Sequence, residues 1–321
     1  MPTYTELYGI ENYSDDTINN LIEANVVSFF DWGLLNIGAF TNINSGVVDG
    51  FGVDMAELQP ALVEGQDDAT VWQSRHMNWV WESGTKYPVI DISGVYVDSV
   101  FYPTDTSGTY SHYYDYPLGR VVFDNPVPTS STVVVNHSFK HVDVTSYDEV
   151  NFSKLIQSDI DTHFDSSVLG SGEFDVDGSF RQQLPVIMVE VPITRKNKPF
   201  ELGSLAQYRN THVIFHLLST DKTEVSKLMD IINYQSDKTI VLYDTNLVAS
   251  GDAFPLDYRG MKKDDAKIYP TMVEPLADGG YRVQNFKSSR MRFADVVPGN
   301  IQNFNSNLFY GTVKLIGEII L

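Results

Sequence analysis

The stretch LPVIMVEVPITRKNKPFELGSLAQYRNTHVIFHLL, residues 184–218, predicts two apolar strands joined by a long hairpin. The connecting segment opens with Arg195, Lys196 and Lys198, so three cations fall within four residues and no acid lies among them. The whole chain, in contrast, carries a formal net charge of -20. The hairpin therefore concentrates positive charge in an acidic protein.

Helical and strand patterns follow this hairpin toward the C-terminus. Residues 219–233 predict a helix that is capped at Ser219 or Thr220. Apolar residues at helical spacing give this helix a core face, formed by Val225, Leu228, Met229 and Ile232. Further strands are expected at three apolar or alternating stretches, which are residues 238–246, 281–293 and 307–321.

The N-terminal half predicts one long helix followed by a β region. Residues 17–36 have apolar positions at helical spacing, and the preceding residues offer N-cap oxygens, from Ser14, Asp15 and Asp16. Residues 71–146 alternate short aromatic and β-branched runs with turn residues, including a hairpin turn at Asp98-Ser99. One strand of this region is expected to place four side chains on one face: Val133, Val135, His137 and Phe139.

These patterns predict an α+β fold with two domains, which the length of 321 residues accommodates. The first domain, residues 1–146, is acidic and contains the helix 17–36 and an antiparallel sheet or sandwich over residues 71–146. The second, residues 147–321, has the order helix, strand, hairpin, helix, strand. Its first helix is expected over residues 146–164, with Ser146 and Glu149 as a capping box.

The negative charge is concentrated in the first half of the chain. Residues 1–150 hold 4 basic and 21 acidic residues, whereas residues 151–321 hold 18 basic and 21 acidic residues. A surface with this much negative charge repels the phosphates of nucleic acid, so we do not expect the protein to bind nucleic acid sequence-specifically. The negative charge is better explained by a partner protein with a basic surface, or by a channel wall along which DNA moves without binding.

Other features of the composition narrow the class of protein. The chain has no cysteine, which removes disulfides, thiolate metal sites and cysteine nucleophiles and suits assembly in a reducing cytosol. No apolar run is long enough to span a bilayer, and the N-terminus shows no cleaved signal. We expect no membrane association.

Two patterns imitate metal sites without completing them. The loop EFDVDG, residues 173–178, resembles the start of a calcium loop, but Leu184 stands where the twelfth position needs an acid. Histidines occur four residues apart at His137 and His141 and again at His212 and His216. Both pairs lie in strand-like segments, where that spacing separates the side chains by about 13 Å. We therefore expect no metal and no cofactor.

No motif localises catalytic residues, and we expect that the protein is not an enzyme. The sequence has no nucleophile elbow, HExxH helix or phosphate-binding glycine loop. A cryptic hydrolase with an Asp/Glu pair stays an alternative because acids are plentiful. The aromatic residues of the β region form either core or a sugar-stacking platform: Trp72, Trp79, Trp81, Tyr87, Tyr96, Tyr102, Tyr110, Tyr113 and Tyr114.

The order of elements around the hairpin resembles that of structural proteins of tailed-bacteriophage virions, in particular tail terminators and head–tail joining proteins. The features that carry the resemblance are the strand with Leu184-Pro185, Ile187 and Val189-Glu190, the hairpin from Thr194 to Thr211, and the helix around residues 228–232. The chain departs from small terminators by about 145 additional N-terminal residues. Neck, tail end and baseplate therefore all stay open as positions in the virion.

The resemblance implies a non-enzymatic protein, made in the host cytoplasm, that forms a closed ring in the virion neck or tail. Its partners would be copies of itself, as a hexamer or another closed ring, and virion proteins such as the tail tube, sheath, portal or connector. DNA would at most pass through the channel. The expected interface cations are Arg195, Lys196, Lys198, Arg282, Lys287, Arg290 and Arg292. The alternative is a baseplate, fibre-anchoring or carbohydrate-binding module that uses the aromatic sheet.

Overall fold

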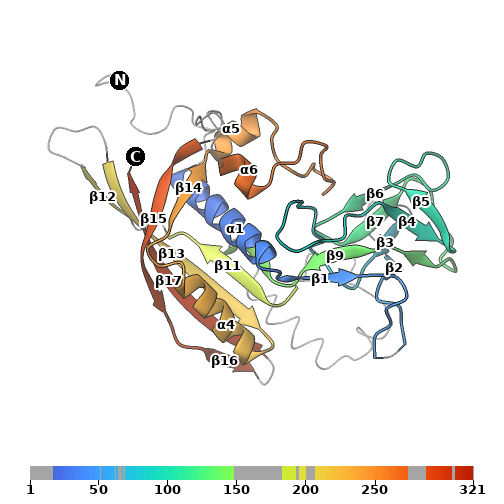
Figure 1. The fold of residues 1–321 in the computed structure, drawn as a ribbon, viewed down its shortest axis with the longest axis horizontal. Coiled ribbons are helices and arrows are strands. Elements are labelled where there is room, and N and C mark those ends of the chain that lie inside the picture. The colour runs from blue at the N-terminus through green and yellow to red at the C-terminus, as the bar shows by residue number, and fades with distance from the viewer. Residues whose placement is uncertain are drawn as a thin grey trace.

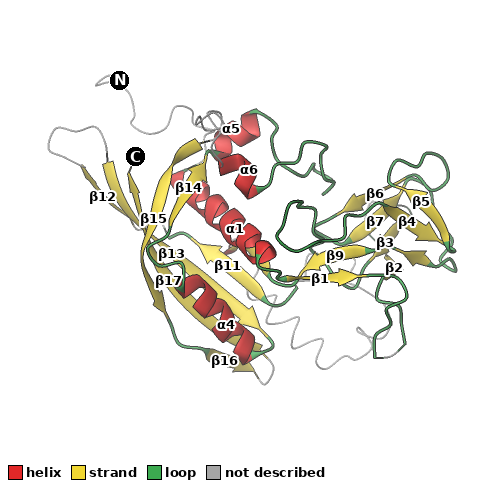
Figure 2. Cartoon of the chain, viewed as in Figure 1, coloured by secondary structure: helices red, strands yellow, loops and turns green. Residues whose placement is uncertain are grey.

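The computed structural model describes residues 17–50, 52–61, 63, 67, 69–147, 183–192, 195–199, 207–273, 287–305 and 308–320. These residues form two lobes, each with its own hydrophobic core (Figure 1). Mostly antiparallel sheets and a few helices build them, so the predicted α+β class is confirmed (Figure 2). The calcium-like loop 173–178 and the predicted helix beyond Tyr147 lie outside the described residues.

The larger lobe is built on an eight-stranded sheet, called here the large sheet. Its strands are β10 (Asp143–Ser146), β11 (Val186–Glu190), β12 (Arg195–Pro199), β13 (Gln207–Ser219), β14 (Thr239–Tyr243), β15 (Lys287–Pro298), β16 (Gln302–Asn305) and β17 (Leu308–Ile320). Their order is β10-β11-β13-β17-β15-β14, with β12 paired to β13 and β16 paired to β17. β10 and β11 run parallel, and the other described pairs are antiparallel. The predicted hairpin is confirmed, because β12 pairs with the first part of β13.

Two helices cover one face of the large sheet (Figure 1). α1 (Ile18–Asn36) and α4 (Lys222–Asn233) both contribute to the core formed with β11, β13, β15 and β17. The predicted core face of α4 is confirmed, since its four residues are buried: Val225, Leu228, Met229 and Ile232. Alternation along β13 puts Phe215 and Leu217 on the helix side and His216 on the opposite face.

Both helices begin at a different cap from the one expected. Thr17 caps α1, and its side chain accepts a hydrogen bond from the Asn20 amide. Asp221 caps α4 by accepting from the Thr223 amide at 2.8 Å. Ser219, one of the two predicted caps, instead donates to Glu224 at 2.6 Å. In each helix a residue closer to the first turn thus takes the capping role, a threonine in α1 and an aspartate in α4.

The two cores divide the chain differently from the predicted boundary at residues 146 and 147. Ile22, Val26 and Phe30 of α1 are buried against the large sheet, although α1 was assigned to the N-terminal domain. β10 also belongs to the large sheet, where Ser146 pairs with Val189 of β11. The apolar face of α1 packs on strands of the large sheet that lie more than 100 residues further along the chain. Local sequence patterns do not reveal such a contact.

The smaller lobe, called here the β lobe, comprises β1 to β9 within residues 40–140. Its strands are β1 (Phe40–Ile43), β2 (Glu57–Ala61), β3 (Val71–Gln73), β4 (Gly94–Val97), β5 (Val100–Pro103), β6 (His112–Asp115), β7 (Arg120–Phe123), β8 (Val133–Val134) and β9 (His137–Lys140). Seven form an antiparallel sheet in the order β5-β4-β8-β2-β3-β7-β6, and β1 pairs with β9. The predicted hairpin turn is confirmed at Asp98 and Ser99, which both have positive φ values of 49° and 68°.

The strand expected across residues 133–139 is broken after Val134. β8 pairs with β2 and β4, whereas β9 leaves that sheet and pairs with β1. Asn136 stands at the break, and its side chain accepts a hydrogen bond from the Ser45 amide at 2.7 Å. All four side chains that were expected on one face are nevertheless buried: Val133, Val135, His137 and Phe139.

A segment of the larger lobe reaches across to the β lobe. It lies between α5 (Thr245–Ser250) and α6 (Tyr269–Val273). The Tyr116 amide donates to the Gly260 carbonyl at 3.1 Å, and the Lys262 Nζ lies 3.8 Å from Asp91 Oδ1. Gly260 has a φ of 78°, and a Cβ atom there would lie 2.5 Å from Asp115 Oδ1. A side chain at this position would require the Asp115 carboxylate to move and would adopt an unfavourable positive φ.

Candidate functional site

Strand pairing brings the two basic runs of the sequence to one end of the large sheet. Lys196 pairs with Asn210, Asn210 with Glu318, and Glu318 with Arg292. These four residues form one row across β12, β13, β17 and β15, about 14 Å wide at the usual strand spacing. We call this region the basic end of the large sheet. In Figure 1 it lies on the side of the larger lobe away from the β lobe.

The predicted interface cations fall into two groups. Arg195, Lys196 and Lys198 lie on β12, and their register partners on β13 are Thr211, Asn210 and Tyr208. Lys287 begins β15 and pairs with Tyr243, and Arg290 pairs with Val241. For β12 and Lys287 the structure describes the backbone and not the side chains, and Arg282 lies outside the described residues. The register thus joins two segments that are about 90 residues apart in sequence.

Arg292 has acidic partners within the chain. Its guanidinium lies 2.6 Å from Asp237 Oδ1 and 3.2 Å from Glu318 Oε2. Arg290, two residues earlier on the same strand, is exposed. The carboxylates at Arg292 reduce the charge that it presents to a partner.

Arg209 is a further cation at the basic end that the sequence analysis did not select. It is the register partner of Asn197 on β12 and of Ile319 on β17. Its position is next to the row that contains Lys196 and Arg292. Its place in the sequence, fourteen residues after Arg195, gave no indication of this proximity because the pairing register of the hairpin decides it.

The β lobe carries the opposite charge. Residues 39–142 hold 12 acidic and 4 basic residues, a net charge of -8. Most of the cations are already engaged: Arg75 pairs with Asp49 at 2.6 Å, Arg120 is buried, and Lys140 makes two buried ion pairs. The exposed acids at the outer strands include Asp98, Asp105 and Asp124.

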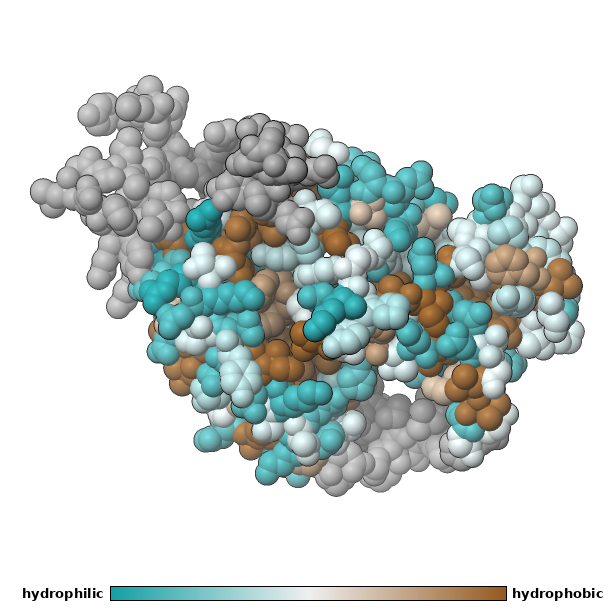
Figure 3. Space-filling model, viewed as in Figure 1, coloured by the Kyte–Doolittle hydropathy of each residue, from teal (hydrophilic) through white to brown (hydrophobic). Residues whose placement is uncertain are grey.

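The surface of the β lobe also carries exposed apolar residues. Val100 and Phe101 of β5 are 54% and 43% exposed, and Val47 and Val48 are exposed on a separate loop. Figure 3 shows hydrophobic surface at the outer end of this lobe, and Figure 1 places β4 and β5 there. Val100 and Phe101 lie close to Asp98 in the chain, so apolar and acidic residues adjoin at this edge.

Three of the nine aromatic residues considered for a sugar-stacking platform in the β lobe are buried in its core. Trp72 and Trp79 are each 1% exposed and belong to the hydrophobic core. Tyr114 is also buried, and Tyr102 packs on Tyr110 with a ring-centroid distance of 4.5 Å. The core interpretation of these residues is therefore the one that the described burial supports.

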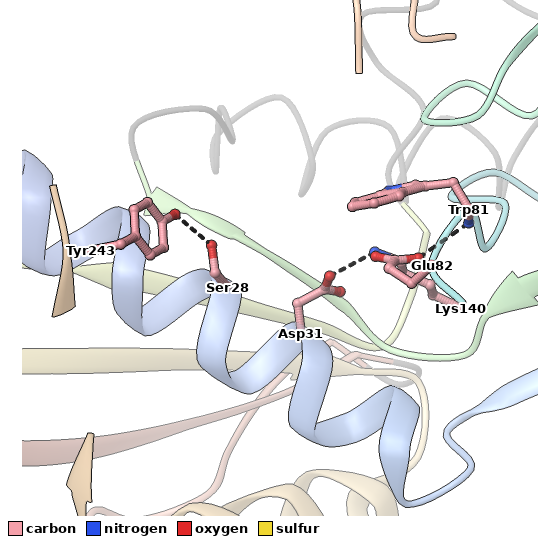
Figure 4. Close-up of polar contacts among 6 residues, drawn as sticks. All are labelled: Ser28, Asp31, Trp81, Glu82, Lys140 and Tyr243. Atoms are coloured by element: carbon pink, nitrogen blue, oxygen red, sulfur yellow. Dashed lines mark hydrogen bonds and ion pairs between the residues drawn. The ribbon is translucent and has the colours of Figure 1, made fainter. Parts of the chain in front are cut away.

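Lys140 makes a buried polar contact where the lobes meet (Figure 4). Its Nζ atom lies 2.6 Å from Asp31 Oδ2 of α1 and 2.7 Å from Glu82 Oε1. Glu82 also accepts a hydrogen bond from the Trp81 amide at 3.1 Å. Burial raises the pKa of Glu82, while the two carboxylates raise the pKa of Lys140 against the opposing effect of burial. The ammonium group therefore stays charged and ties α1 to the β lobe.

His216, on the face of the large sheet opposite α1 and α4, contacts two polar groups and an aromatic ring. The His216 Nε2 atom lies 2.8 Å from Glu190 Oε2, and its Nδ1 atom lies 2.6 Å from the Tyr310 hydroxyl. The Tyr147 ring stacks on the imidazole with a centroid distance of 4.6 Å. Burial raises the pKa of Tyr310, and its hydroxyl and the Glu190 carboxylate each lie within hydrogen-bond distance of one ring nitrogen. Both ring nitrogens are thus occupied, which leaves neither for a metal.

A serine and a histidine meet in the β lobe, but in its interior. The Ser74 hydroxyl lies 3.4 Å from His137 Nε2, and the other ring nitrogen of His137 bonds the Val135 carbonyl at 2.9 Å. Both residues are fully buried, and burial lowers the pKa of His137 to about 4. A substrate cannot reach this pair, so it is a polar contact of the core and not a catalytic dyad.

The described residues thus offer charged and apolar surfaces more than a chemical centre. No group of three or more metal-ligating side chains occurs among them, and none of the helices in this part of the chain is long and apolar enough to cross a bilayer. Searches against protein-family models and against curated proteins find no match to the chain.

Proposed function

We propose that this chain is a non-enzymatic structural protein that assembles with copies of itself into a closed ring in the neck or tail of a tailed-phage virion. The observation that supports the assembly best is the separation of charge along the molecule. Basic residues gather at the end of the large sheet, and the acidic β lobe lies on the other side of the larger lobe (Figure 1).

Such a charge distribution favours head-to-tail association. An interface with two-fold symmetry places one patch against itself, so a basic patch would face a basic patch. A head-to-tail interface instead places the basic end of one copy against the β lobe of the next. Because each copy keeps one unused surface of each kind, addition continues until the ring closes.

The place of this ring in a virion rests on the resemblance of residues 184–233 to tail terminators and head–tail joining proteins. Portal, connector, sheath or tail-tube proteins would be its neighbours, and DNA would pass through its channel. A net charge of -20 is consistent with that role, because an acidic wall does not retain DNA.

The proposal is tested by reversing charge on β12. We expect the double variant Arg195→Glu, Lys196→Glu to fold as the wild type does and to stay monomeric where the wild type forms rings. Its matched control is Lys222→Glu, Lys227→Glu, which changes the net charge equally on the exposed side of α4. Size-exclusion chromatography with light scattering gives the mass, alone and with a virion partner.

The control separates a local contact from general repulsion. If the α4 variant also loses assembly, net charge and not β12 controls association. If the β12 variant assembles like the wild type, the proposed interface is wrong. If the wild type is a monomer under all conditions, including with virion partners, the proposed ring is wrong.

A further inference from the structure

β5 is an open edge of the β-lobe sheet. It pairs with β4 on one side, from Val97 opposite Val100 to Gly94 opposite Pro103, and among the described strands it has no second partner. Its sequence, VFYP, contains no charged residue, although edge strands are commonly protected by charges. Val100 and Phe101 remain substantially exposed. This strand therefore combines free backbone groups with apolar side chains, which favours pairing with another strand.

β12 is an open edge of the large sheet. It lies beside the first part of β13, in line with β11, which pairs with the later part of the same strand. β10 covers the outer side of β11, but no described strand pairs with the outer side of β12. The backbone groups on that side are available to a strand from another molecule.

We propose that β12 of one copy pairs with β5 of the neighbouring copy, so that the large sheet of one subunit continues into the β-lobe sheet of the next. This inference rests on the proposed ring and specifies the contact within it. Main-chain hydrogen bonds would supply the pairing, and burial of Val100 and Phe101 would add apolar stabilisation.

Charge complementarity selects these two edges for each other. Asp98 stands at the β4–β5 turn, and Asp105 follows the end of β5, so acids flank the apolar strand at both ends. β12 carries Arg195, Lys196 and Lys198 within a strand of five residues. A second β12 in the place of β5 would bring cations against cations, so pairing of β12 with itself is disfavoured.

The two strands also have matching lengths and positions. β5 has four residues and β12 has five, and each ends in a proline, Pro103 and Pro199, which limits how far a new ladder extends. They lie at opposite ends of the molecule in Figure 1, as a head-to-tail contact requires.

Cysteine cross-linking tests this contact cleanly because the chain has no cysteine of its own. The test variant is Val100→Cys with Asn197→Cys. The matched control is Val48→Cys with Asn197→Cys, since Val48 is 58% exposed and Val100 is 54% exposed in the same lobe. Phe101→Cys with Asn197→Cys serves as a second test variant if the first fails to fold.

After mild oxidation of assembled protein, we expect non-reducing gels to show a ladder of covalent multimers for the test variant and not for the control. Two results would overturn the β12–β5 contact although rings of normal mass form. One is that neither test variant gives a ladder, and the other is that the control gives an equal ladder. In both cases the proposed ring itself would stand. A wild-type protein that never assembles would overturn the ring and this contact together.

Discussion

At the scale of single residues, Lys140 links the two lobes by ion pairs to Asp31 and Glu82. We expect Lys140→Met to destabilise the protein by about 3 to 5 kcal/mol, because Glu82 is left as a buried carboxylate without its cation. The free energy of unfolding from urea titration measures this effect.

The double variant Lys140→Met, Glu82→Gln checks the cause. It also removes the negative charge of Glu82, which the single variant leaves buried without a cation, so it should be more stable than Lys140→Met alone. A double variant that is no more stable than the single one would show that the loss comes from packing of the lysine chain and not from the carboxylate.

We expect the buried His137 to lower the free energy of unfolding at acidic pH. Burial lowers its pKa in the folded protein to about 4, with a further lowering contribution from His76, whereas an unfolded histidine titrates near its ordinary value of 6.5. Between these two pKa values the unfolded state therefore binds more protons than the folded state. The contribution of His137 to the free energy of unfolding is fully present above about pH 6.5 and decreases as the pH falls toward 4. This residue should account for about 3 kcal/mol of that loss.

The control for this prediction is His137→Gln, which cannot titrate. Its free energy of unfolding should change less than that of the wild type between pH 7 and pH 4, when both are measured by urea titration at each pH. Parallel pH profiles for the two proteins would mean that other groups cause the acid sensitivity.

At the scale of elements, α4 packs closely on β17. A Cβ atom at Gly311 would lie 2.8 Å from Val225 Cγ1 and 3.0 Å from Met229 Sδ. Gly311→Ala should therefore destabilise the protein by about 1 to 3 kcal/mol, because the helix must move away from the strand. Thermal and urea denaturation provide the measurement.

Gly33 offers the opposite case within α1. A Cβ atom there meets nothing within 4 Å, so Gly33→Ala should stabilise the protein by about 0.5 to 1 kcal/mol through helix propensity. If Gly311→Ala were as well tolerated as Gly33→Ala, the close contact between α4 and β17 would be wrong.

Local sequence patterns predicted the presence of individual helices and strands better than they predicted which of these elements pack against each other. The core face of α4, the hairpin at Asp98-Ser99 and the pairing of β12 with β13 all follow from short-range periodicity and turn residues, and all are confirmed. The packing of α1 on the large sheet is a contact between distant segments, and its weakly amphipathic sequence does not name its partner. At the break after Val134, Asn136 likewise contacts a distant segment, since it accepts a hydrogen bond from the Ser45 amide.

The candidate site shows the same limit. Charge density alone selected Arg195, Lys196 and Lys198, but the pairing register decides that Arg209 and Arg292 lie beside them. The acidic partners of Arg292 could not be predicted either, because Asp237 and Glu318 come from separate elements. Composition thus predicted that a basic surface exists, and the fold determines its members.

At the scale of the whole molecule, the proposed ring requires a contact between the basic end of the large sheet and the β lobe of a neighbour. Reversing both surfaces in one chain tests this contact most directly. The chain would carry Arg195→Glu and Lys196→Glu on β12 together with Asp98→Lys and Asp105→Lys around β5.

Because the two surfaces exchange their charges, this chain should regain the assembly that each pair of substitutions abolishes alone. The decisive measurement is the mass by light scattering of the two double variants and the combined variant. We expect monomers for both double variants and rings of wild-type mass for the combined variant. A combined variant that stays monomeric although it folds, or double variants that assemble normally, would show that this contact does not form.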